Sequence, residues 1–151
     1  MISNSCLKIF ELEDLLPLVK NWKQLKETIS LCHGCFDFLH YGHLIHFIEA
    51  SELADHMIVS VTRDKFIKKG KNRPYFNENQ RLSMVGAMCM VDAATLNNSE
   101  SSVDIINLLQ PDIYVKGPDY KTLSTNVNQN IHEEINAIKS INAKIYFTNG
   151  K

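Results

Sequence analysis

Five short apolar runs, separated by segments with helical periodicity, constrain the fold of this 151-residue chain more than any other feature. The runs are Ile29–Cys32, Met57–Val61, Ala93–Leu96, Ile113–Lys116 and Lys144–Thr148. Their length and apolar content are typical of buried strands. Strands that alternate with helices at this spacing indicate right-handed crossovers and a parallel sheet. We therefore expect an α/β fold with a five-stranded parallel sheet and helices on both faces.

The segments between the runs carry apolar residues at intervals of three or four, which is the period of an amphipathic helix. Helices are expected from about Asp14, from Tyr41 to about Leu53, from Asn77 to about Met90, from Ser101 or Ser102 to Leu109, and over Ile131–Ile138. The first of them tolerates Pro17 only in its opening turn. Residues 1–27 are expected to form a helical extension packed on the core, and residues 28–151 the main domain.

Composition excludes several classes of protein. With 44% apolar and 22% charged residues and a net charge of −1, the chain is globular and lacks the basic excess of a nucleic-acid or membrane-surface binder. No apolar run approaches the roughly 20 residues that a membrane helix needs. The N-terminus is acidic where a secretion signal is basic, which predicts a cytoplasmic protein. Its four cysteines are expected to be free thiols.

The segment that follows the first run concentrates the polar chemistry. Ligands of open α/β sheets bind beyond the carboxyl ends of the strands, and Cys32–His43 lies at such an end. Gly34 and Gly42 allow close approach of the backbone, while His40 and His43 are three positions apart at a helix start. Because free amides at a helix N-terminus favour an anion, this pattern predicts a phosphate site.

Two other interpretations of the same segment are weaker. A histidine pair can bind zinc, but only Asp37 is spaced to help, so no metal site is predicted. Cys32 and Cys35 have the spacing of a redox pair without the surrounding thioredoxin pattern. We therefore keep redox chemistry as the least favoured alternative.

A resemblance to a known family rests on the same segment. Gly34, Phe36, Asp37, His40, Gly42 and His43 stand as G-x-F-D-x-x-H-x-G-H, which resembles the signature of the cytidylyltransferase-like nucleotidyltransferases. Further segments resemble the heptose 1-phosphate adenylyltransferases within that superfamily, namely Arg73-Pro74, Gln80-Arg81, Val91-Asp92 and Pro111–Tyr120. The resemblance covers nearly the whole chain and implies a single Rossmann-like domain.

The resemblance implies transfer of a nucleotide from a triphosphate to a phosphorylated small molecule, with release of pyrophosphate. ATP, a heptose-like sugar 1-phosphate and Mg²⁺ bound with the nucleotide are the expected substrates and cofactor. The alternatives are a CTP-dependent enzyme for a polyol phosphate such as glycerol 3-phosphate, and a non-catalytic nucleotide-binding domain. A homodimer, or a place within a longer chain, is the expected assembly.

The resemblance also assigns site residues. His40, His43 and Lys68 are the expected catalytic residues. Residues expected to bind the nucleotide are Gly34, Cys35, Phe36, Asp37, Gly42, Arg73, Arg81, Lys116, Gly117 and Asp119. Seven basic and two acidic residues lie between Arg63 and Arg81, which suits a cleft for two phosphorylated substrates. Lys69 and Lys71 in that stretch are expected to be solvated.

One departure from the family pattern concerns the C-terminal segment. The resembled enzymes carry a Ser/Thr-rich segment at a helix start after the fifth strand, where it contacts the triphosphate. This chain reads Asn149-Gly150-Lys151 at the corresponding place. We therefore expect the domain to lack that part of the site.

Overall fold

The predicted parallel sheet is present. The computed structural model describes residues 6–120 and 129–150. The strands are β1 (Ile29–Gly34), β2 (His56–Thr62), β3 (Ala93–Asn97), β4 (Ile113–Lys116) and β5 (Lys144–Phe147). Their order in the sheet is β3-β2-β1-β4-β5, and every pairing is parallel. Because the chain reverses direction across the sheet between β3 and β4, the carboxyl ends of β1 and β4 flank the point where such folds bind ligands.

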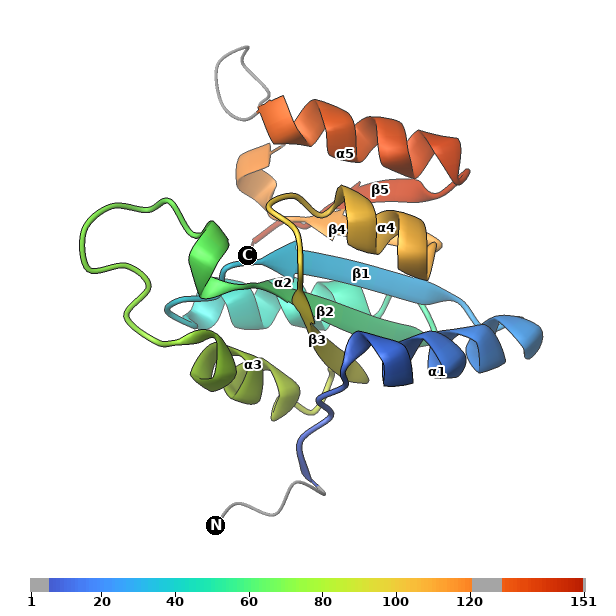
Figure 1. Ribbon diagram of the computed structural model, residues 1–151. Coiled ribbons are helices and arrows are strands. Elements are labelled where there is room, and N and C mark those ends of the chain that lie inside the picture. The colour runs from blue at the N-terminus through green and yellow to red at the C-terminus, as the bar shows by residue number, and fades with distance from the viewer. Residues whose placement is uncertain (1–5, 121–128, 151) are drawn as a thin grey trace.

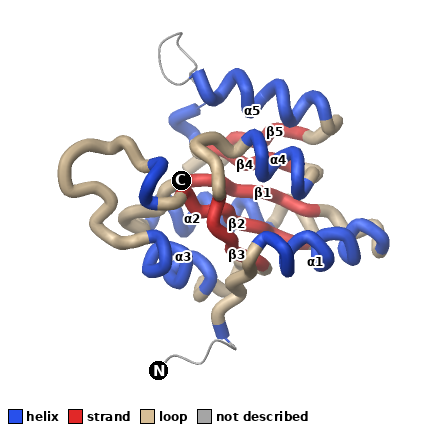
Figure 2. The backbone as a smooth tube through the Cα atoms, in the orientation of Figure 1, coloured by secondary structure: helices blue, strands red, loops and turns tan. Residues whose placement is uncertain are grey.

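Helices cover both faces of the sheet, as expected (Figures 1 and 2). They are α1 (Leu12–Gln24), α2 (Tyr41–Ser51), α3 (Glu78–Gly86), α4 (Val103–Leu109) and α5 (Gln129–Ser140), with short 3₁₀ turns η2 (Asp64–Phe66) and η3 (Pro118–Tyr120). One apolar cluster lies between the sheet and α2 and α3, and the other between the sheet and α1, α4 and α5. This is one doubly wound domain with a core on each side of the sheet.

Helix boundaries differ from the sequence prediction in α1, α2 and α3, and α5 extends two residues beyond the expected range at each end. Helix α1 begins earlier than expected, so Pro17 lies in its second turn rather than its first. Helix α2 ends at Ser51, shortly before the expected Leu53. Helix α3 ends at Gly86 rather than near Met90, and the backbone N–H of Lys8 donates to the Gly86 carbonyl at 3.2 Å. An unpaired carbonyl of the last turn is thereby satisfied from outside the helix.

The N-terminal segment is joined to the sheet and to its core. The backbone of Ala94 in β3 exchanges hydrogen bonds with Lys8 and Phe10, at 2.7 and 2.9 Å. Helix α1 then contributes Leu15, Val19 and Trp22 to the apolar cluster beneath α4 and α5. Residues 8–24 therefore share hydrogen bonds and apolar contacts with the sheet.

Aspartates close the amino end of the sheet. The carboxylates of Asp55, Asp92 and Asp112 accept the backbone N–H groups of Thr28, Met57 and Ile29, each at 2.8 Å. These bonds satisfy amides that begin strands and would otherwise lack a partner. Within residues 6–120 and 129–150, no helix has the length and apolar character needed to span a membrane.

Candidate functional site

The two expected catalytic histidines lie together at the start of α2. His40 is the N-cap residue, and its Nδ1 accepts the backbone N–H of Gly42 at 3.1 Å. In the neutral ring this places the proton on Nε2, which can donate to a ligand. The rings of His40 and His43 are 4.0 Å apart between centroids. A Cβ at Gly42 would lie 2.9 Å from the His40 ring, so the glycine permits this cap.

Gly34 and Phe36 shape the turn that leads to the histidines. Phe36 has a φ of 50°, and its ring lies where a Cβ of Gly34 would be, at 2.9 Å. The Phe36 ring is buried and meets the ring of His43 edge-on, with centroids 5.5 Å apart. The Phe36 side chain therefore packs against His43 and supports it.

The surroundings of His43 favour the neutral form of its ring. Burial lowers the pKa of His43, and the nearby His40 and Lys69 lower it further, against an opposing effect of the Phe38 backbone. Its Nδ1 is buried and makes no hydrogen bond with any residue in the described part of the chain. A neutral ring with one N–H can donate to a phosphate oxygen and gain a proton as negative charge accumulates.

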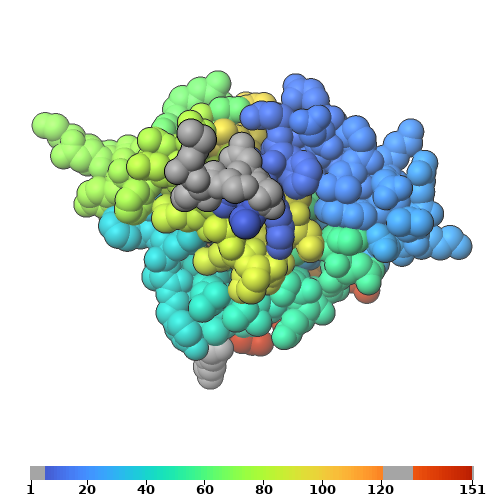
Figure 3. Space-filling model, turned by 90° about the horizontal axis from the view of Figure 1, so that it is seen from below, coloured from blue at the N-terminus to red at the C-terminus, as the bar shows by residue number. Residues whose placement is uncertain are grey.

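Asp37 joins this turn to the basic loop (residues 67–76). Its carboxylate accepts from Arg73 Nη1 at 2.8 Å and from the backbone N–H groups of Tyr75 and Phe76 at 2.8 and 3.1 Å. Burial opposes ionisation of Asp37, but these hydrogen bonds outweigh it and lower the pKa. The guanidinium of Arg73 also stacks on Tyr75, 4.1 Å from the ring centroid. Asp37 thus holds the end of the basic loop beside α2, and the loop and the start of α2 share one edge of the molecule in Figure 3.

Arg81, which is expected to bind the nucleotide, has its guanidinium fully engaged inside the protein. Its side chain is 0% exposed. It donates to the carbonyls of Cys35, Thr62 and Phe76 and to the carboxylate of Asp64, over 2.5–2.9 Å. Arg81 therefore ties the ends of β1 and β2 to the start of α3 and shapes the site indirectly.

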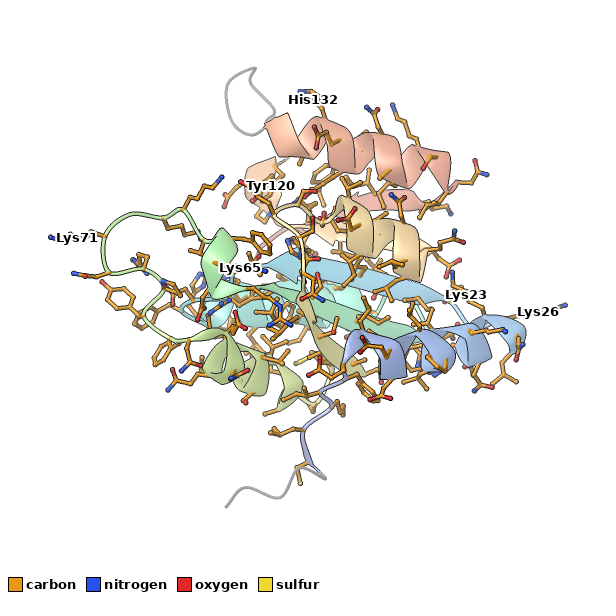
Figure 4. The ribbon with its side chains drawn as sticks, in the orientation of Figure 1. Lys23, Lys26, Lys65, Lys71, Tyr120 and His132 are labelled. Atoms are coloured by element: carbon orange, nitrogen blue, oxygen red, sulfur yellow. The ribbon has the colours of Figure 1, made fainter. Side chains whose placement is uncertain are left out.

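Among the lysines of the basic loop, Lys69 is exposed, and its charge acts on His43 and Cys35. It lowers the pKa of both His43 and Cys35, although burial is the largest influence on each group. Lys68, the expected catalytic lysine, instead pairs with Glu100 in the loop after β3. Lys71 projects outward from the bend of the basic loop (Figure 4). The charge of Lys69 therefore acts on the histidine site, while the catalytic role expected of Lys68 stays a prediction.

Lys116, Gly117 and Asp119, which are expected to bind the nucleotide, lie at the carboxyl end of β4, the strand next to β1. A Cβ at Gly117 would meet nothing within 4 Å, so the backbone there is open to a ligand. Asp119 is exposed in η3. Lys116 is buried and pairs with Glu134 of α5 at 2.9 Å.

Sequence reasoning missed Glu134 and the link between α2 and the end of β5. Glu134 lies three positions after Ile131, on the apolar stripe of α5, and a carboxylate on a buried stripe is the signal that predicts a partner. His46 Nδ1 lies 3.0 Å from Thr148 Oγ1, and burial lowers the pKa of His46 to about 4. No feature of the sequence around Thr148 predicts its contact with α2.

The described residues do not form a metal site or a reactive thiol pair. Within residues 6–120 and 129–150, no three His, Cys, Asp or Glu side chains are grouped to hold a metal ion. Asp37, the acid next to the histidines, already has its oxygens engaged, so the residues do not fit a protein-held Mg²⁺. The cysteines in the described part are free, and burial raises the pKa of Cys32 and Cys35, the reverse of a redox cysteine.

Known proteins share sequence similarity with much of this chain. The chain is 35% identical over 115 residues to the bifunctional protein HldE of Methylobacillus flagellatus, covering 75% of this chain and 24% of the relative. It is 32% identical over 144 residues to the same-named protein of Aliarcobacter butzleri, covering 94% of this chain and 30% of the relative. The chain thus spans about a quarter to a third of the length of the curated relatives it matches.

Solved structures show the same fold. A lipopolysaccharide core biosynthesis protein from Thermoplasma volcanium superposes with a TM-score of 0.64 at 26% identity, over 80% of this chain and 93% of the other. A pantoate-beta-alanine ligase from Francisella tularensis gives the same TM-score at 15% identity, over 94% and 66%, which supports the fold alone. The sequence model described as cytidylyltransferase-like matches residues 31–147, and the chain belongs to that family.

Proposed function

We propose that this chain is a nucleotidyltransferase, which joins a nucleoside triphosphate to a phosphorylated acceptor and releases pyrophosphate. The observation that carries the proposal is the pair of imidazoles, 4.0 Å apart, at the N-terminus of α2. The amides of that helix end, the two rings and the charge of Lys69 together favour a polyphosphate. Family membership supports the same reaction class.

The reaction needs positioning and charge stabilisation rather than a covalent enzyme intermediate. An acceptor phosphate oxygen attacks the α-phosphorus in line, the bond to the bridging oxygen breaks, and pyrophosphate leaves with the electron pair. His40 and His43 would donate hydrogen bonds to the oxygens on which charge develops. Mg²⁺ would arrive as part of the triphosphate substrate.

ATP and a heptose-like sugar 1-phosphate are the substrates we favour. The relatives named HldE and the structural neighbour from lipopolysaccharide core biosynthesis support a sugar acceptor. The rival is CTP with a polyol phosphate such as glycerol 3-phosphate, which the family's cytidylyltransferase-like description favours. We further propose that the chain forms a homodimer or is part of a longer chain.

Pyrophosphate release tests the proposal directly. The chain is assayed with each of the four common nucleoside triphosphates against heptose 1-phosphate and glycerol 3-phosphate, and His40→Ala/His43→Ala is the control for contaminating activity. We expect turnover with ATP and the sugar phosphate. CTP preference with glycerol 3-phosphate would support the rival. Binding of nucleotide without turnover on any pair would support a non-catalytic domain instead.

A further inference from the structure

A buried ion pair lies where β1 and β4 end. Lys116 Nζ is 2.9 Å from Glu134 Oε2, and the two side chains are only 8% and 7% exposed. The same ammonium lies 3.5 Å from the Tyr114 hydroxyl and 4.3 Å from the centroid of the Tyr120 ring. The Lys116 ammonium is therefore in contact with groups from α5, β4 and the end of η3.

Further polar groups extend this pair into a network. The Tyr114 hydroxyl is 2.8 Å from Ser102 Oγ at the start of α4. On β1, His33 Nδ1 lies 2.6 Å from Ser60 Oγ. Burial lowers the pKa of His33 to about 4, and the charge of Lys116 contributes to this shift. These hydrogen bonds connect β4 with α4 and α5, and His33 with Ser60 forms a second polar pair that joins β1 to β2.

Stability alone does not explain a charged pair in this place. Desolvation of two buried charges offsets much of their attraction, and apolar side chains of similar size are often as stable or more stable. The same face of the sheet is filled by Leu31, Ile58 and Ala93 towards its amino end. At the carboxyl end of this face, where this fold binds ligands, Lys116 and Glu134 place a charged pair among the packed side chains.

The backbone of Lys116 connects this network to the histidine helix. Its carbonyl accepts the backbone N–H of Thr148 at 3.0 Å, and the Thr148 hydroxyl lies 3.0 Å from Nδ1 of His46 on α2. A shift of Lys116 would therefore move both the rim at Gly117–Tyr120 and the contact with α2.

We propose that Glu134 is a positioning residue, which holds Lys116 and through it the Gly117–Tyr120 rim in the shape that receives the nucleotide. The inference rests on the nucleotidyl transfer proposed above. It gives α5 a role in nucleotidyl transfer, and this role does not follow from any of the family motifs in the sequence. Glu134 is not in the position of a ligand, since its carboxylate faces Lys116.

Glu134→Gln, with Glu133→Gln as its matched control, tests the proposal. Glu133 is the exposed neighbour on the same helix. We expect Glu134→Gln to raise KM for the triphosphate by about 10- to 100-fold, the range of one hydrogen bond to a charged group, with a smaller change in kcat. Glu134→Asp should recover part of the loss. An unchanged KM in a folded Glu134→Gln protein would overturn the proposal.

A paired replacement separates positioning from simple stabilisation. Lys116→Met/Glu134→Leu removes both charges and keeps the volume, so we expect a melting temperature equal to or above that of the parent chain. The proposal predicts that this stable protein still shows the raised KM. A KM equal to that of the parent chain would show that the pair serves packing only and would contradict the proposal.

One readout is independent of turnover and separates this proposal from the proposed function. If the parent chain releases no pyrophosphate from any triphosphate, the proposed function fails. Backbone amide hydrogen exchange at Gly117, Asp119 and Tyr120 can still be measured, and its rate reports how firmly the Gly117–Tyr120 rim is held. We expect faster exchange in Glu134→Gln than in Glu133→Gln, and equal exchange in the two variants would overturn the positioning role.

Discussion

The two ends of the sheet use the same kinds of residue for different purposes. At the amino end, Asp55, Asp92 and Asp112 accept backbone amides that begin strands. At the carboxyl end, Asp37 also accepts backbone amides, but it holds a cationic loop next to two histidines. Residue type therefore does not distinguish structural from functional acids in this fold. Their place along the strands does.

The largest expected effect is on stability, from Arg81. Arg81→Ala removes a fully buried guanidinium and leaves the Cys35, Thr62 and Phe76 carbonyls without their donor. We expect a loss of about 3–5 kcal/mol in the free energy of unfolding, measured by urea denaturation, because breaking a buried pair leaves unsatisfied groups. Arg73→Ala is the comparison, since Arg73 is partly exposed, and should lose about 1 kcal/mol or less. Equal losses in the two variants would contradict the difference drawn between these arginines.

Next in size is the effect of the histidine pair on turnover. His40→Ala and His43→Ala should each lower kcat by about 10²–10³, the loss typical of one preorganised donor. Melting temperatures should change little by comparison. His132 is exposed on α5, and His132→Ala is the control with unchanged kcat. Near-normal turnover in either site variant would remove the proposed role of that histidine.

A smaller effect is expected at the amino end of the sheet. Asp92→Ala removes the carboxylate that accepts the Met57 amide at 2.8 Å. We expect a loss of about 1.5–3 kcal/mol in the free energy of unfolding and no change in KM for the triphosphate. Steady-state kinetics below the melting temperature checks the second point. A raised KM would show that the two ends of the sheet are not functionally separate.

The basic loop offers a matched pair of lysines. Lys69→Ala should raise KM for the triphosphate by about tenfold, since it removes a cation that acts on the histidine site. Lys68→Ala should have a smaller effect, because Lys68 pairs with Glu100. The reverse order would restore Lys68 as the phosphate-binding lysine.

The smallest expected effect is on the pH dependence of binding. In the free protein, the pKa of His43 is lowered by burial and by the neighbouring His40 and Lys69. A bound polyphosphate would raise that pKa, so affinity should increase as the pH falls from about 8 to about 6. Calorimetry in buffers of different ionisation enthalpy should show proton uptake, and His43→Ala should take up less. Proton release on binding would contradict this picture.

The apolar runs and the glycines that follow them predicted the sheet and the position of the histidine pair. Apolar runs locate strands, and glycines beside a helix start locate the turn, because both signals are local. The burial of Arg81 was not predictable in this way, since its oxygen partners come from three separate segments of the chain. The family resemblance selected Lys68, but the basic loop lacks a repeating pattern that would predict which of its lysines acts on His43. Glu134 did carry a signal, a carboxylate on an apolar stripe, but its partner was identifiable only in three dimensions.

The proposed function depends most on the binding of nucleoside triphosphate phosphates by the imidazoles of His40 and His43 at the start of α2. NMR of the ¹⁵N-labelled histidine rings during titration with ATP and Mg²⁺ tests it most directly. We predict that the ring signals of His40 and His43 shift and that the pKa of His43 rises, while the ring of His132 stays unchanged. Saturable ATP binding that leaves both of the first two rings unperturbed would contradict the account.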